Sequence, residues 1–202
     1  MSFILVWEKS GEQVKVFDNI ISKKDQKFIK NNLLDNGNFP WSYVSDVSKK
    51  GNTHQRRPGF KHIFKNYNLI EPILVNTRIK LKRNIFEHEN NILEARSFLQ
   101  LPLDKNFIGK GVDTPHLDRT EPHLVVLYYV NDSEGDTIIY DYKSKDENDI
   151  PYFEDVKELK RIKPKQGRVV VFDGLYWHTA EQPRDDIRCI ININLNETWQ
   201  YK

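Results

Sequence analysis

Three side chains of types that bind metal ions stand out in this 202-residue sequence. His116 and Asp118 are two residues apart, so on an extended backbone their side chains project to the same side. His178 follows sixty residues later, shortly after an apolar run at positions 168–172. Two imidazoles and one carboxylate on one face of a metal ion, with the other positions open, suit a non-haem Fe(II) centre. We therefore predict that His116, Asp118 and His178 are the metal ligands and the catalytic residues.

An arginine follows His178 by ten residues and opens an alternating run, Arg188-Cys189-Ile190-Ile191-Asn192-Ile193-Asn194-Leu195. The alternation is typical of a strand, and it predicts that Arg188, Ile190, Asn192 and Asn194 share the face toward the site. Cys189, Ile191 and Ile193 would then face a supporting layer. A charged arginine on a buried strand needs an anionic partner, because an unpaired buried charge is costly. A dicarboxylate co-substrate would supply that partner.

These residues lie within a longer resemblance. From about Glu94 to Trp199 the chain resembles the 2-oxoglutarate- and Fe(II)-dependent dioxygenases, most closely the prolyl 4-hydroxylase-like branch. Three segments carry it besides the His-x-Asp, His and Arg set: Leu127-Tyr128-Tyr129-Val130-Asn131 is similar to the branch's Tyr-Leu-Asn strand end, Gly135-Asp136-Thr137 to its Gly-x-Thr turn, and Pro164-Lys165-Gln166-Gly167 to its Pro-Lys-x-Gly run. Positions 14–35 match more loosely.

The resemblance implies an enzyme that hydroxylates a C–H bond with Fe(II), 2-oxoglutarate and O₂, and that releases succinate and CO₂. It implies that Arg188 binds the distal carboxylate of 2-oxoglutarate and that the Tyr129 hydroxyl is a second anchor, unless Tyr129 is only a packed core residue. Thr137 and Asn192 are expected to line the same pocket. The implied substrate is a prolyl residue of a peptide or protein, or a small amino-acid-like metabolite.

The chain departs from the family on one strand. Members often carry a co-substrate-binding tyrosine before the His-x-Asp motif, but no tyrosine occurs between Asn91 and His116. Gln100 and Arg96 are the candidates to replace it. His123 lacks a carboxylate two residues on, and His54 and His62 lack ligand spacing, so none of the three is expected to bind the metal.

The expected fold class is α+β, mainly β, with a double-stranded β-helix (jelly roll, cupin-like) core and N-terminal supporting helices. We expect a single domain over 1–202, with helical support and a basic loop in 1–90 and the jelly roll in 91–202. Alternating or apolar runs predict strands at 13–17, 95–101, 123–130, 137–140, 167–173 and 187–195. One helix should begin after Ser22, with Phe28 on its apolar face, and a second should include 70–85. The insertion 142–163 should be anchored by Ile150, Tyr152 and Phe153.

Charge is distributed unevenly along the chain. Positions 47–83 hold ten basic residues and one acidic residue, a net charge of +9 in a chain whose total is +2. This segment is either a solvated loop with a polar helix face or a basic patch that attracts an anionic substrate or nucleic acid. Gly51-Asn52-Thr53 and Pro58-Gly59 are typical of a loop that could form a lid over the pocket. The single cysteine, Cys189, cannot form an intramolecular disulfide, and no signal peptide or membrane span is visible. We therefore expect a cytoplasmic protein, of a cell or of an infected host cell, without a membrane partner.

Two alternatives remain open. A nucleic-acid-directed oxygenase is not favoured, because no further arginine follows Arg188 on its strand to hold a flipped base. A non-catalytic cupin-like binding module would lack turnover, and the complete ligand set together with Arg188 disfavours it.

Overall fold

Two antiparallel sheets face each other in the computed structural model, which describes residues 13–47, 57–82, 91–102, 112–152 and 154–196. The larger sheet has the strand order β1-β8-β5-β10-β4-β3-β2 and the smaller one β7-β6-β9. The strands of the larger sheet are β1 (Val14–Phe17), β2 (Ser42–Val44), β3 (Gly59–Ile63), β4 (Ile92–Gln100), β5 (His123–Tyr129), β8 (Val169–Asp173) and β10 (Arg188–Asn196). The smaller sheet consists of β6 (Thr137–Lys143), β7 (Glu158–Ile162) and β9 (Tyr176–Ala180). This architecture confirms the expected mainly β jelly roll.

The two faces of β10 separate two apolar cores. Cys189, Ile191 and Ile193 pack in a cluster with residues of the helices, whereas Ile190 belongs to the cluster between the sheets. Arg188 and Asn192 line the cavity on that inner face. Strand β10 lies at the centre of the larger sheet, paired with β4 on one side and β5 on the other. The predicted alternation is therefore confirmed for Arg188, Ile190 and Asn192, which line the cavity, whereas Asn194 is buried but does not line it.

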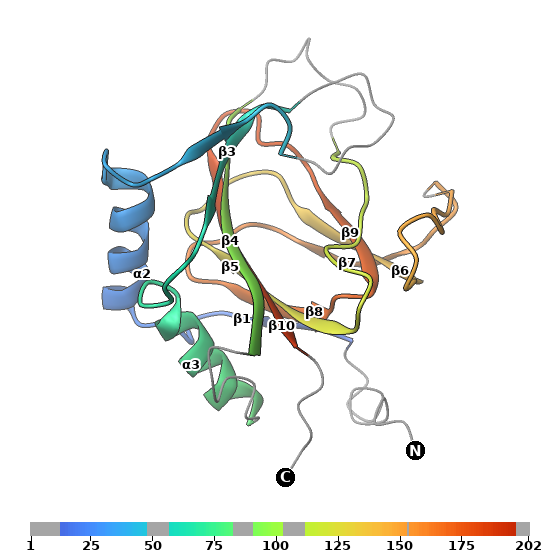
Figure 1. Ribbon diagram of the computed structural model, residues 1–202, viewed down its shortest axis with the longest axis horizontal. Helices are drawn as coiled ribbons and strands as arrows, with labels where there is room; N and C mark the ends of the chain where they lie inside the picture. Colours follow the sequence, from blue (N-terminus) through green and yellow to red (C-terminus); the bar gives the residue numbers. More distant parts are fainter. Residues whose placement is uncertain (1–12, 48–56, 83–90, 103–111, 153, 197–202) are drawn as a thin grey trace.

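The helices cover the outer face of the larger sheet. Figure 1 shows α2 (Lys23–Lys30) and α3 (Glu71–Leu81) on one side of this sheet and β6, β7 and β9 on the other. A five-residue π-helix, Asn31–Asp35, continues α2. Ser22 caps α2 as predicted, because its hydroxyl accepts from the Asp25 amide at 3.1 Å. In α3, Leu74 and Thr77 are fully buried, and Leu74 packs in the same core cluster as residues of the larger sheet.

Several expectations about segments were wrong. Residues 59–63 form β3 inside the larger sheet, although the sequence was interpreted as a loop there. Part of the expected insertion forms β7, at the edge of the smaller sheet, and its predicted anchors Ile150 and Tyr152 are exposed. Phe28, expected on the apolar face of the first helix, is also exposed. The two strands β3 and β7 form because they pair with neighbouring strands of the fold. A short, charged edge strand such as β7 has no sequence pattern that separates it from a loop.

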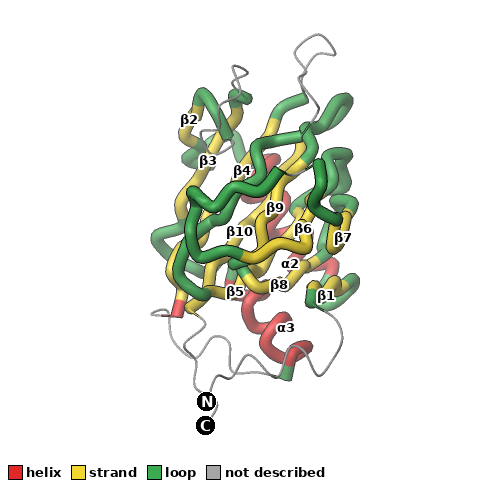
Figure 2. The backbone as a smooth tube through the Cα atoms, turned by 90° about the vertical axis from the view of Figure 1, so that its right-hand side faces the viewer, coloured by secondary structure: helices red, strands yellow, loops and turns green. Residues whose placement is uncertain are grey.

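Some predictions concern positions outside the described residues, namely the lid at Gly51-Asn52-Thr53, His54, Phe153, and the end of the second helix at Ile85. In the described part of the chain, no helix is both long and apolar enough to cross a membrane. Figure 2 shows how the strands of the two sheets are layered, with both helices behind them. A cavity lies between the two sheets, lined by Phe98 and Asn192 of the larger sheet and by Thr137 and His178 of the smaller one.

Candidate active site

The three predicted metal ligands converge between the sheets. His178 lies in β9, and a backbone bridge joins it to His116: the His116 amide donates to the His178 carbonyl at 2.9 Å, and the reverse bond measures 3.1 Å. One ligand atom from each of His116, Asp118 and His178 lies within 4.8 Å of the others. Within the described residues, these three side chains form the group of His, Cys, Asp or Glu whose ligand atoms lie close enough together to hold one metal ion.

Each imidazole is held in the orientation that metal binding needs. Nδ1 of His116 lies 3.1 Å from the Thr114 carbonyl, and Nδ1 of His178 lies 3.0 Å from the Tyr176 carbonyl. A carbonyl only accepts, so both Nδ1 atoms carry a hydrogen, and in the neutral form of each ring Nε2 keeps the lone pair that a metal ion needs. The two Nε2 atoms lie 3.8 Å from opposite oxygens of Asp118. Burial and the neighbouring His178 lower the pKa of His116 to about 4, so its ring is neutral near pH 7.

Asp118 is held by a pair of residues that face each other across β4 and β10. Arg96 donates to Oδ1 of Asp118, and Asn192 Nδ2 donates to Oδ2 at 2.8 Å. Burial by itself raises the pKa of Asp118, but the Arg96 charge and the two imidazoles outweigh it and hold the pKa far below its ordinary value. Asp118 is therefore ionised, and both of its oxygens are fixed in position. Such partners orient a metal ligand and tune its basicity.

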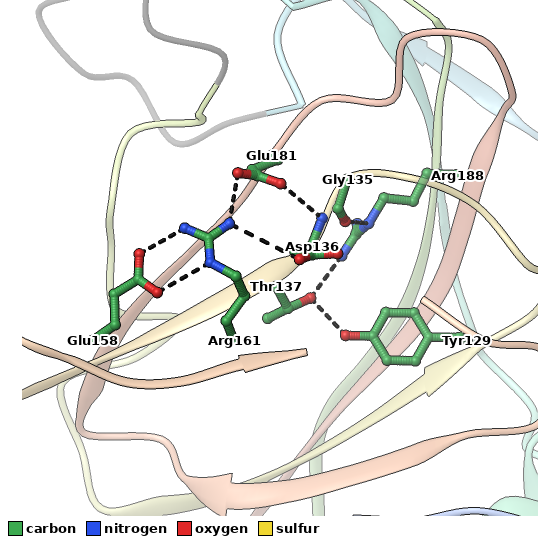
Figure 3. Close-up of polar contacts among 8 residues, drawn as sticks. All are labelled: Tyr129, Gly135, Asp136, Thr137, Glu158, Arg161, Glu181 and Arg188. Atoms are coloured by element: carbon green, nitrogen blue, oxygen red, sulfur yellow. Dashed lines mark hydrogen bonds and ion pairs between the residues drawn. The ribbon is translucent and has the colours of Figure 1, made fainter. Parts of the chain in front are cut away.

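Arg188 lies four residues from Asn192 along β10, at the other end of the cavity. Its side chain is 3% exposed, and it forms three hydrogen bonds to neutral acceptors: Nε to the Gly135 carbonyl at 2.8 Å, Nη1 to Gln100 Oε1 at 2.6 Å and Nη2 to Thr137 Oγ1 at 2.8 Å. Figure 3 shows the guanidinium held against the turn that contains Gly135 and Thr137. A guanidinium has five N–H groups, so two remain for a further acceptor.

The backbone conformation and the close neighbours at position 135 require a glycine. Its φ is +86°, and a Cβ at this position would lie 2.5 Å from the Glu181 carbonyl and 3.1 Å from Cδ of Arg188. A side chain here would therefore strain the backbone and push against the arginine.

The Tyr129 hydroxyl donates to Thr137 Oγ1 at 2.7 Å. Thr137 thus accepts from both Tyr129 and Arg188, and its own hydroxyl hydrogen is left to donate elsewhere. Thr137 lines the cavity, whereas Tyr129 is not one of its lining residues. Figure 3 shows the Tyr129 hydroxyl pointing at Thr137. The predicted role of Tyr129 as a direct anchor of 2-oxoglutarate stays a prediction.

Apolar side chains separate the two polar ends of the cavity. Phe98 and Ile190 form the register pair between Arg96–Asn192 and Gln100–Arg188, and Leu127 lines the same stretch. The four residue-to-residue steps from Arg188 to Asn192 span about 13 Å of strand. At the metal-ligand end, the buried Oδ1 of Asn192 has no partner within the described residues. Three metal ligands, an apolar middle and a buried cation fit Fe(II) together with a dicarboxylate.

The two candidates to replace the missing tyrosine take different positions. Gln100 accepts from Arg188, at the cationic end of the cavity, whereas Arg96 contacts Asp118, at the metal-ligand end. His123 does not converge with the ligands: its Nδ1 faces the Glu121 carbonyl at 2.8 Å, and its ring occupies the space that a Cβ at Gly174 would need. His62 packs between Phe39 and Phe64, as a structural residue does.

Sequence reasoning missed Asp113 of the cavity wall and its partner Arg57. Asp113 is buried in the wall, and Arg57, which the sequence placed in a solvated loop or a surface patch, is buried against it. The interpretation of the whole basic segment as solvent-facing is therefore wrong for Arg57. No sequence signal marked this pair, because more than fifty residues separate its members and each has the composition of an ordinary surface residue.

Comparisons with family models and with curated proteins find no match. Solved structures do match in fold. A viral collagen prolyl hydroxylase from Paramecium bursaria Chlorella virus 1, in complex with 2-oxoglutarate, has a TM-score of 0.56 at 15% identity and covers 92% of this chain and 96% of its own. The α-ketoglutarate-dependent carbocyclase SnoK from nogalamycin biosynthesis has a TM-score of 0.64 at 11% identity, with 97% of this chain and 84% of its own covered.

A prolyl hydroxylase from Trichoplax adhaerens, solved with a peptide fragment of the hypoxia-inducible factor oxygen degradation domain, has a TM-score of 0.57 at 14% identity. The match covers 94% of this chain and 86% of that one. These structures share the arrangement of strands and helices across almost the whole described chain. The protein therefore has the fold of the 2-oxoglutarate- and Fe(II)-dependent oxygenases, prolyl hydroxylases among them.

Proposed function

We propose that this protein is an Fe(II)- and 2-oxoglutarate-dependent oxygenase that hydroxylates a C–H bond. One observation carries the proposal: the convergent His116, Asp118 and His178 share a cavity with the buried cation Arg188. A metal site alone would not need this arginine. The hydrogen bonds that this buried guanidinium forms within the described residues all go to neutral acceptors, so it can still pair directly with an anion, and a dicarboxylate that reaches from the metal to Arg188 supplies one.

Each residue then has a defined task. His116, Asp118 and His178 would hold Fe(II), which with 2-oxoglutarate and O₂ supplies the oxidation of a C–H bond and the release of succinate and CO₂. Arg188 and Thr137 would bind the distal carboxylate and so fix the position of the co-substrate. Arg96 and Asn192 keep Asp118 ionised and oriented. The apolar walls exclude water from the middle of the cavity.

For the substrate we propose a prolyl residue of a peptide or protein first, and a small amino-acid-like metabolite second. Two of the compared structures are prolyl hydroxylases, one of them solved with a peptide, whereas SnoK is a carbocyclase. The unpartnered Oδ1 of Asn192, at the metal-ligand end, is the candidate acceptor for a polar group of the substrate.

The test is succinate release by the purified protein supplied with Fe(II), 2-oxoglutarate and O₂, first alone and then with proline-containing peptides and free amino acids. Peptide-stimulated succinate release together with a mass increase of one oxygen atom on the peptide supports prolyl hydroxylation. Stimulation by a free amino acid alone selects the second substrate class. A complete lack of 2-oxoglutarate binding in the metal-loaded protein would contradict the proposed function itself.

A further inference from the structure

A line of buried polar side chains runs from Arg188 across the end of the cavity. Arg188 Nη1 donates to Oε1 of Gln100 at 2.6 Å, and Nε2 of Gln100 donates to Oδ2 of Asp113 at 3.1 Å. Arg57 Nε then lies 3.2 Å from Oδ1 of Asp113. All four side chains are at least nine-tenths buried, with exposed fractions between 3% and 7%. They come from four separate parts of the chain, so the fold has assembled this line.

Further contacts fix the line at its far end. Arg57 Nη2 also donates to the Val112 carbonyl at 2.9 Å, and Gln182 Nε2 donates to Oδ1 of Asp113 at 2.6 Å. The backbone of Asp113 is bonded through both of its polar groups, its amide to the Ala180 carbonyl and its carbonyl to the Thr179 hydroxyl. Asp113 therefore cannot turn its carboxylate away from Gln100 without breaking several buried hydrogen bonds.

The orientation of Gln100 follows from its two charged neighbours. Its amide group faces a carboxylate and its carbonyl faces a guanidinium. The flipped amide would put donor against donor at Arg188 and acceptor against acceptor at Asp113, so one orientation is strongly preferred. Gln100 thereby transmits the position of Asp113 to Arg188.

The charges in this line do not cancel. Burial raises the pKa of Asp113, and the charges of Arg57 and Arg188 act against that shift. With Asp113 ionised, the four side chains of this line carry two positive charges and one negative charge, a net charge of +1. Asp46, which is half-buried, also acts on Asp113, less strongly than Arg57 and Arg188 do. Were Arg57 absent, Asp113 would offset the charge of Arg188, and the pocket would lose its attraction for an anion.

We propose that Arg57 and Asp113 are positioning residues that set the orientation and the net charge around Arg188, so that this end of the cavity binds a single carboxylate group. The inference rests on the proposed function, in which that group is the distal carboxylate of 2-oxoglutarate. It gives Arg57, which belongs to the basic segment, a role inside the site and not at the surface.

The experiment separates charge from structure with four variants. Arg57→Gln removes the charge but keeps a hydrogen-bond donor, Arg57→Lys keeps the charge, and Arg57→Gln combined with Asp113→Asn removes both charges and restores +1. Arg161→Gln is the matched control, because Arg161 does not line the cavity and pairs with Glu158, Glu181 and, at 3.9 Å, Asp136 (Figure 3). For each variant, calorimetry without O₂ measures the affinity for Mn(II) alone and then the affinity of the Mn(II)-loaded protein for 2-oxoglutarate.

We expect Arg57→Gln to weaken 2-oxoglutarate binding about tenfold or more, with the Mn(II) Kd unchanged. The double variant and Arg57→Lys should bind 2-oxoglutarate within about threefold of wild type, and Arg161→Gln should equal wild type. A merely structural ion pair would lower the melting temperature without this pattern of loss and rescue.

Two results would overturn the inference: wild-type 2-oxoglutarate affinity in Arg57→Gln, or a double variant that binds no better than Arg57→Gln. If Arg57→Gln does not fold, the double variant decides, since it keeps the net charge of +1; binding about tenfold weaker than wild type would then refute the inference. A wild-type protein that fails to bind 2-oxoglutarate contradicts the proposed function, whereas wild-type binding with unaffected Arg57 variants contradicts this inference alone.

Discussion

Replacing Arg188 by lysine should weaken 2-oxoglutarate binding while it leaves metal binding almost unchanged. The guanidinium donates to three separate acceptors, on Gly135, Gln100 and Thr137, at 2.6–2.8 Å. An ammonium is a single nitrogen and cannot reach all three acceptors while it also binds a carboxylate through two parallel hydrogen bonds. Because Arg188 contacts none of the three metal ligands, the Kd of the metal should stay at the wild-type value.

The size of the effect follows from the contacts that are lost. One charge-assisted hydrogen bond contributes about 1.5–3 kcal/mol, which corresponds to an increase of about 10–150-fold in the KM for the co-substrate. Tyr129→Phe should raise the same KM less, since it removes one neutral hydrogen bond, to Thr137, which is worth about 0.5–1.5 kcal/mol.

The assay is succinate release as a function of 2-oxoglutarate concentration, with the Mn(II) Kd measured separately in the absence of co-substrate. If Arg188→Lys has the wild-type KM for the co-substrate, the arginine is structural and the reasoning fails. An equal loss of metal affinity would also refute it, because the effect would then have spread to the ligands.

Three further outcomes are expected. His178→Ala should abolish Fe(II)-dependent succinate release while circular dichroism still shows a folded protein; full activity would refute its assignment as a ligand. Gly135→Ala should raise the KM for the co-substrate, because the new Cβ meets Cδ of Arg188 at 3.1 Å, and an unchanged KM would show that the turn gives way. Asp18, whose hydrogen bond to Arg168 lowers its pKa from 3.8 to about 2, should stabilise the fold above pH 4 and lose this contribution as the pH falls toward 2. The melting-temperature difference between wild type and Asp18→Asn should therefore shrink over that range; a difference independent of pH would contradict this.

The parts of the fold that the sequence predicted well are those in which a local pattern and a buried environment agree. In β10 the period-two alternation separates the helix-facing residues from the cavity-facing Arg188 and Asn192, because both faces of this central strand are buried and chemically different. Ser22 and Asp25 marked the start of α2 because a capping interaction is local to a few residues.

The parts that could not be predicted depend on contacts between distant segments. Strand β3 contains lysine and histidine among its five residues, so its pairing with β4 is set by the sheet and not by its own pattern. In the same way, nothing near Arg57 in the sequence indicates that Asp113 would bury it. Charged residues in a basic run are usually exposed to solvent. Arg57 is buried only because the assembled fold places it against Asp113 of the cavity wall.

The proposed site is tested most directly by a crystal structure of the protein with Mn(II) and 2-oxoglutarate in the absence of oxygen. We predict anomalous density for the metal between Nε2 of His116, Nε2 of His178 and the Asp118 carboxylate. The far carboxylate of 2-oxoglutarate should lie on Arg188 and Thr137. Metal bound elsewhere, or a co-substrate whose far carboxylate does not contact Arg188, would contradict the proposed site.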